Sequence, residues 1–195
     1  MTKWILCLCA AAALAACDNH SGNESASAPA EKPMINAEQR AQLVKSATVG
    51  MSEERDKMES ISFFSAKDEP WIDTGITVYL SVPDDSSPIL RIVPHYHGDS
   101  WIFFNTVKVM ADGKIVYERS LDGLRMKHDN NTTGVYESAD YAAEAADLFA
   151  IRAIAGASSV TVRLAGEKRE DVDLSPAAIA RVKRVVKAYN ELAAL

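Results

Sequence analysis

Residues that alternate between apolar and more polar types limit the folds open to this chain more than any other feature. The run from Ile76 to Ser81 alternates in this way, and the run from Trp101 to Met110 is rich in aromatic and β-branched residues. Because successive side chains of a β-strand point to opposite faces, both runs are predicted to be strands. Asp112-Gly113 follows the second run and favours a tight turn, so Ile115 to Tyr117 is predicted to return beside it as a hairpin.

Further segments extend this pattern and add helices. Shorter alternating or dense apolar runs predict strands at 61–64, 89–93 and 159–165, and the polar stretch 127–134 is predicted to be a loop. Capping residues and helical spacing predict four helical segments: 36–49, a short one at 52–58, 138–155, and a final helix that begins at Ser175-Pro176.

These elements together predict an α+β fold, in which one antiparallel β-sheet packs against two to three helices. Residues 36–195 are predicted to form a single globular domain, preceded by a flexible linker. At 48% hydrophobic residues, the chain can bury a core of that size. Its net charge of −6 is unsuited to nucleic acid, which requires a basic surface.

The first 16 residues have the composition of an export signal, with one positive residue before an apolar run. That run, Trp4 to Ala16, is 13 residues long and so shorter than the roughly 20 of a spanning helix. It ends in Leu14-Ala15-Ala16-Cys17, which resembles the lipobox of bacterial lipoproteins. The resemblance implies that residues 1–16 are a signal peptide removed before Cys17, and that Cys17 carries covalent diacylglycerol and fatty acyl groups such as palmitate. Ordinary cleavage at the same bond, which would release a soluble protein, is the alternative.

Residues 17–35 are predicted to form the lipidated N-terminus and a flexible linker, because they are rich in small and polar residues and lack apolar periodicity. Asp18-Asn19 directly after Cys17 is similar to the signal that keeps lipoproteins in the inner membrane of some bacteria. The resemblance therefore implies a lipid-anchored protein of the cell envelope that faces the periplasm, with the inner membrane favoured over the outer membrane. Two or more acyl chains hold a protein stably on a membrane.

His95-Tyr96-His97 is the most metal-like pattern in the chain. On a strand, both imidazole rings would point to the same side and could meet one ion. A metal site would need a further ligand from the following candidates: His128, Asp129 and Asp99. The alternative is a pair of solvent-facing histidines beside the turn at Gly98. No metal is therefore assigned, and His95 and His97 remain weak metal candidates and possible ligand-binding or partner-binding residues.

Aromatic residues form a second candidate site, comprising Trp71, Trp101, Phe103 and Phe104. Trp101 and Phe103 would share one face of the predicted strand and Phe104 would lie on the other, so both faces are apolar. Core packing is one interpretation. The other is an exposed patch for docking, with Trp71 and Trp101 as possible ligand-binding or partner-binding residues.

Motifs of hydrolases are missing from the sequence, which has neither Gly-x-Ser-x-Gly nor His-Glu-x-x-His. Paired acids such as Asp68-Glu69 and Asp84-Asp85 are typical of turns. No catalytic residue and no cofactor beyond the lipid is therefore assigned. The sequence favours a non-enzymatic binding or accessory module for an envelope protein partner. The alternative is a metal-dependent hydrolase or a ligand sensor of the envelope that uses His95 and His97.

Overall fold

Antiparallel strands are the main component of the described chain, which comprises residues 35–70, 73–193 and 195 of this computed structural model. Sheet A contains seven strands: β1 (Met51–Asp56), β2 (Ile61–Ala66), β3 (Gly75–Pro83), β4 (Ile89–Gly98), β7 (Met126–Asn131), β8 (Gly134–Ala139) and the short β9 (Tyr141–Ala142). Sheet B contains four strands: β5 (Thr106–Ala111), β6 (Lys114–Ser120), β10 (Val160–Ala165) and β11 (Arg169–Asp173). The helices are α1 (Ala37–Ala47), α2 (Ala145–Gly156) and α3 (Pro176–Leu192).

The strand order confirms antiparallel pairing in both sheets. Sheet A runs β1-β2-β3-β4-β8-β7, with β9 paired to β4, and sheet B runs β11-β10-β5-β6. The predicted α+β class is confirmed, with the strands divided between two antiparallel sheets where the sequence predicted one. The β5–β6 hairpin turns at Asp112 (φ +46°) and Gly113 (φ +78°), as the sequence predicted. Positive φ at both central residues matches the twist of the flanking strands.

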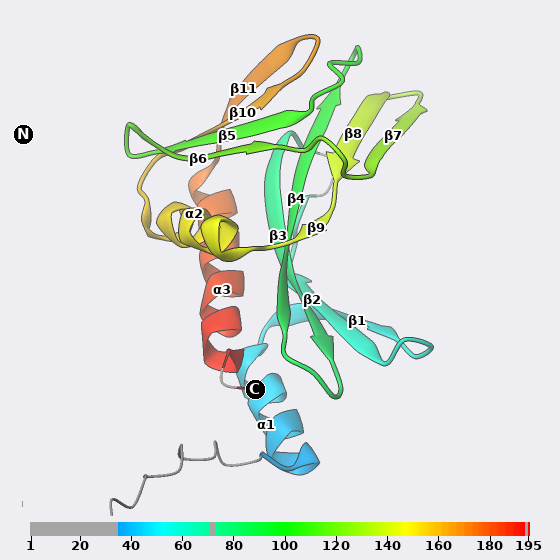
Figure 1. The fold of residues 1–195 in the computed structure, drawn as a ribbon, viewed down its shortest axis with the longest axis vertical. Helices are drawn as coiled ribbons and strands as arrows, with labels where there is room; N and C mark the ends of the chain where they lie inside the picture. Colours follow the sequence, from blue (N-terminus) through cyan, green and yellow to red (C-terminus); the bar gives the residue numbers. More distant parts are fainter. Residues whose placement is uncertain (1–34, 71–72, 194) are drawn as a thin grey trace, which may run out of the picture. The chain divides into compact units, whose positions relative to one another are not determined.

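Figure 1 shows how the two sheets and the helices are arranged. One hydrophobic core joins the two sheets to α2 and α3. Leu80 and Ile92 enter it from sheet A, Val109 from sheet B, Ile154 from α2 and Val182 from α3. Helix α3 contacts β2 and β3, whereas α2 contacts β5 and β6, and the two helices contact each other. The apolar stripe of α3 therefore packs inward, and Ser175 caps its first turn by accepting the Ala178 N–H at 3.1 Å.

Several predicted segments differ in the structure, and edge position explains two of them. The predicted helix at 52–58 is instead strand β1, and the predicted loop at 127–134 contains strand β7. Each is the end strand of sheet A, and most of its side chains are exposed, so no apolar alternation marks it as a strand. Pairing with the neighbouring strand outweighs the local helical preference of Ser52-Glu53-Glu54.

The helix predicted at 138–155 begins later, at Ala145. Residues before it belong to β8 and β9, which pair with β4. The backbone N–H of Glu144 donates to Asp147 Oδ2 at 2.8 Å, which fixes the start of the helix.

Candidate functional site

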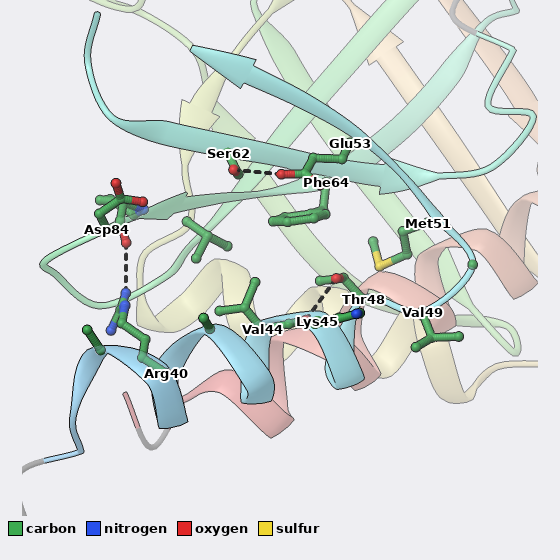
Figure 2. A pocket seen from close by; sticks show the side chains of 15 residues that line it. Arg40, Val44, Lys45, Thr48, Val49, Met51, Glu53, Ser62, Phe64 and Asp84 are labelled. Atoms are coloured by element: carbon green, nitrogen blue, oxygen red, sulfur yellow. Dashed lines mark hydrogen bonds between the residues drawn. The ribbon is translucent and has the colours of Figure 1, made fainter. Parts of the chain in front are cut away.

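A groove of about 830 Å³ lies between helix α1 and strands β1, β2 and β3 (Figure 2). Its apolar walls come from all four elements: Val44 of α1, Met51 of β1, Phe64 of β2 and Val82 of β3. This volume lies within the range of about 300–1,000 Å³ that is typical of ligand-binding clefts. We call this feature the α1 groove.

Helix α1 spans the α1 groove because it is attached near both of its ends. Near its start, Arg40 donates to the backbone carbonyl of Pro83 at 2.8 Å (Figure 2). Beyond its end, Arg184 of α3 donates to the backbone carbonyl of Gly50 at 3.3 Å. Between these attachments no residue of α1 is fully buried. The helix is therefore held over sheet A without filling the space beneath it.

Both carboxylates that line the α1 groove have hydrogen-bond partners. Glu53 accepts a hydrogen bond from the Ser62 hydroxyl at 2.9 Å, and Asp84 pairs with Arg55 at 2.7 Å. The hydrogen bond from Arg55 holds the pKa of Asp84 below its usual range. Lys45 also lines the groove and has no hydrogen-bond or ion-pair partner among the described residues. Lys45 is therefore the charged side chain of this groove that is left without a partner in the described part of the chain.

His95 of β4 is buried, with 8% of its surface exposed, and its ring is held at both nitrogens. Nδ1 donates to the backbone carbonyl of Asp73, and Nε2 lies 3.0 Å from the Thr77 hydroxyl. That hydroxyl is 3.2 Å from Glu69 Oε1, to which Arg181 Nε also donates at 3.2 Å. Burial lowers the pKa of His95, and the hydrogen bond to Asp73 opposes this shift. Burial also raises the pKa of Glu69, against the effect of Arg181.

His97 lies along the same cavity as His95 but has different neighbours. Its ring stacks on Tyr136 of β8, with ring centroids 4.4 Å apart, and its Nε2 lies 3.3 Å from the carbonyl of Thr133. Both histidines line a cavity of about 330 Å³ beside the start of α3. As the sequence predicted, the two histidines lie on the same side of a strand, and they line one cavity. Their rings, however, contact different partners.

The further ligand candidates of the sequence, His128, Asp129 and Asp99, do not complete a metal site with these histidines. His128 and Asp129 lie on β7, and Asp99 follows β4. Across residues 35–70, 73–193 and 195, no group of three or more His, Cys, Asp and Glu side chains is arranged to hold a metal ion.

Trp101 takes part in an aromatic cluster at the surface. Its ring stacks on Phe103 at 5.9 Å, and His128 lies 5.7 Å from both rings. Phe103 is 46% exposed, whereas Phe104 is buried in the core. Residues 101–105 are not a strand, contrary to the sequence prediction, because Phe103 adopts a φ of +48° that breaks the alternation.

A buried carboxylate fixes this irregular segment. Glu137 of β8 is 1% exposed, and its side chain accepts the backbone N–H groups of Ile102 (2.6 Å), Phe103 (3.0 Å) and Phe104 (3.0 Å). A Cβ on Gly166 would lie only 1.9 Å from the Phe103 carbonyl oxygen, so glycine is required at that close approach. The Glu137 hydrogen bonds thus hold the strained backbone at Phe103, and Gly166 leaves room for the Phe103 carbonyl.

A second buried carboxylate joins α2 to sheet B. Asp147 accepts hydrogen bonds from the Tyr117 hydroxyl at 2.6 Å and from Arg119 at 2.5 Å. The Tyr117 hydroxyl also lies 3.0 Å from that of Tyr141, whose ring is stacked beneath the Arg119 guanidinium. This network is fully paired and packs within the core, which indicates a structural role.

Cations on the outer side of α3 are largely committed within the chain. Arg181 pairs with Glu69, Arg184 donates to backbone carbonyls beyond α1, and Lys187 pairs with Glu191 at 2.5 Å. These cations of α3 therefore make mainly intramolecular contacts.

Sequence reasoning missed Glu137, although a signal was present. Glu137 shares its strand parity with Val135 and Ala139, both of which pack toward the core, so the alternation itself directs this carboxylate inward. No comparable signal marks Glu69, which lies in an acidic, proline-containing stretch typical of a turn. Cys17, Asp18, Asn19 and Trp71 lie outside the described residues.

Comparisons with known protein families, with curated proteins and with solved structures returned no match. Among the described residues, no helix is both long enough and apolar enough to cross a membrane.

Proposed function

We propose that this chain is a lipid-anchored binding module of the bacterial cell envelope, which holds a segment of an envelope protein in the α1 groove. The observation that carries the proposal is the groove itself, an apolar cavity of about 830 Å³ bridged by a helix that is attached near both ends. The lipobox resemblance supplies the anchor, in the form of acyl groups on Cys17. The proposal includes no catalytic step and no further cofactor.

A polypeptide suits this groove because strand β1 forms one of its walls. β1 is the end strand of sheet A and has no strand partner on its outer side among the described residues. An extended peptide can pair with such an edge through its main chain and place alternate side chains in an adjoining apolar groove. The ammonium of Lys45, which no described residue pairs with, favours a segment that also carries a negative charge.

The proposed location is the periplasmic side of the inner membrane. Asp18 and Asn19 directly follow the proposed lipid-bearing Cys17, in the position of the retention signal described above. Asp18→Ser should move the protein outward in a host that uses this signal. If both versions fractionate with the outer membrane, Asp18-Asn19 does not act as a retention signal.

A bulky residue in the α1 groove tests the binding proposal. Ala41 lines the groove, whereas the adjacent Gln42 is on the same exposed helix but does not line it. We expect Ala41→Trp to lower recovery of the crosslinked envelope partner about tenfold and Gln42→Trp to leave recovery unchanged. Equal recovery with both variants would argue against the α1 groove as the binding site.

A second candidate function is ligand sensing at the cavity of about 330 Å³ that His95 and His97 line. The opposed pKa shifts of His95 and Glu69 favour it, because such shifts gather at binding and catalytic sites. A rise in Tm on addition of envelope glycans or small metabolites would support this function. The alternative of a metal-dependent hydrolase at the same histidines is tested by comparing the zinc content of the purified protein with that of the His97→Ala variant.

A further inference from the structure

Hydrogen positions in the Glu69–Thr77–His95 chain follow from its partners. A backbone carbonyl can only accept a hydrogen bond, so the contact with Asp73 requires a proton on His95 Nδ1. In the neutral imidazole, Nε2 is then an acceptor. It faces the Thr77 hydroxyl at 3.0 Å.

The Thr77 hydroxyl carries one hydrogen and lies between two groups that both need it. Glu69 Oε1 is 3.2 Å away on one side and His95 Nε2 is 3.0 Å away on the other. With Glu69 ionised and His95 neutral, both groups are acceptors, and one of the two contacts lacks a hydrogen. Because Thr77 is buried, water has little access to supply the missing bond.

One added proton completes the chain in either of two forms. In the first, protonated Glu69 donates to the Thr77 hydroxyl, which donates to His95. In the second, His95 Nε2 donates to that hydroxyl, which donates to Glu69. The first form converts to the second when one proton moves from Glu69 to the Thr77 hydroxyl and another moves from that hydroxyl to His95 Nε2. The three residues therefore hold the added proton jointly.

The surrounding charges act on this proton from several elements. Arg181 of α3 contacts Glu69 and favours its ionised form, while burial of both titrating groups favours the form in which each is neutral. Further charged or titratable groups line the same cavity: Asp73 before β3, His97 of β4 and Asp173 at the end of β11. The two acids add negative potential and so support proton uptake.

We infer that Glu69, Thr77 and His95 form a single proton-binding site, which takes up one proton and, once loaded, ties Glu69 through Thr77 to His95. The loaded site joins strands β3 and β4 to Glu69, which also accepts a hydrogen bond from Arg181 of α3. Acidification therefore tightens one wall of the 330 Å³ cavity. This inference does not depend on the α1 groove.

Nuclear magnetic resonance titration of the full chain in detergent micelles tests the inference. We expect the Glu69 side-chain carbon and the His95 ring nitrogens to shift with one common midpoint, above the value of about 4.3 that is usual for glutamate. His95 Nδ1 should stay protonated throughout. Separate midpoints for the two residues in the unmodified protein would overturn the proposal.

Three variants separate proton sharing from simple packing. Glu69→Gln supplies a permanent N–H donor to Thr77, so the change in the chemical shifts of the His95 ring nitrogens at the common midpoint should vanish. Thr77→Val should give His95 and Glu69 independent midpoints, and Thr77→Ser should restore the common one. Glu170→Gln is the control, because Glu170 is exposed on β11 and should leave the midpoint unchanged. An unchanged His95 titration in Glu69→Gln would contradict a shared proton, even if Thr77→Val failed to fold.

Discussion

Replacement of Glu137 by glutamine tests how the surface aromatic segment is held. The Glu137 carboxylate accepts backbone N–H groups from Ile102 and Phe103 on Oε1 and from Phe104 on Oε2. In Glu137→Gln, the amide oxygen can replace only one of these two oxygens. The amide NH₂ group then faces a backbone N–H that has lost its acceptor.

The expected loss follows from the number of hydrogen bonds affected. A hydrogen bond to a charged group contributes about 1.5–3 kcal/mol and a neutral one about 0.5–1.5 kcal/mol. Glu137→Gln removes at least one charged bond and makes the remaining bonds neutral, while burial of an uncharged amide costs less than burial of a carboxylate. We expect the free energy of unfolding to fall by about 2–4 kcal/mol.

Urea denaturation measures this change on the soluble protein produced from residue 18 onward. Tryptophan fluorescence suits the assay because Trp101 adjoins the affected segment. The matched control is Glu167→Gln, at an exposed glutamate that has no hydrogen bond to any described residue, and it should change stability by no more than about 0.5 kcal/mol. If Glu137→Gln were as stable as that control, the carboxylate would not be what holds the segment.

Other substitutions and conditions give further tests. Gly166→Ala, whose Cβ would lie 1.9 Å from the Phe103 carbonyl oxygen, should lower Tm strongly, whereas Gly156→Ala, whose Cβ meets nothing within 4 Å, should leave Tm unchanged or raise it. Burial raises the pKa of Tyr79 to about 12. The stability that the neutral Tyr79 hydroxyl contributes is therefore complete below about pH 10 and is lost as the pH rises toward about 12. Tyrosinate absorbance and circular dichroism should change together over this range. Independent titration of the tyrosines without unfolding would contradict this. Cys17→Ser should abolish labelling by radioactive palmitate and leave an uncleaved precursor, and unchanged labelling would refute the lipobox interpretation.

Local patterns in the sequence predict those parts of the fold that local physics determines. The Asp112-Gly113 turn and the final helix after Ser175-Pro176 are confirmed, because turn conformation, capping and apolar spacing act within a few residues. Strands β1 and β7 escaped prediction because edge strands with exposed side chains have no apolar alternation. Their structure depends on the strand beside them.

The candidate sites depend on contacts between residues far apart in the sequence. The alternation predicted that His95 and His97 share one side of a strand, and both line one cavity. It could not predict that Glu69 and Arg181 would meet beside Thr77, because these two residues are separated by 112 positions. The α1 groove likewise depends on long-range contacts of helix α1, namely the hydrogen bonds of Arg40 and Arg184 and the packing of Leu43, Val44 and Ala47 against the core.

Site-specific photocrosslinking in the protein's own host tests whether a partner binds in the α1 groove. A photoreactive phenylalanine analogue would replace Val49, which is exposed and lines the α1 groove, and in a matched chain it would replace Gln42, which does not line it. We expect one dominant envelope protein to be crosslinked at position 49, to be absent at position 42, and to be lost when Ala41→Trp is combined with the crosslinker. Crosslinks of equal strength at both positions, or a crosslink at position 49 that survives Ala41→Trp, would contradict binding in the α1 groove.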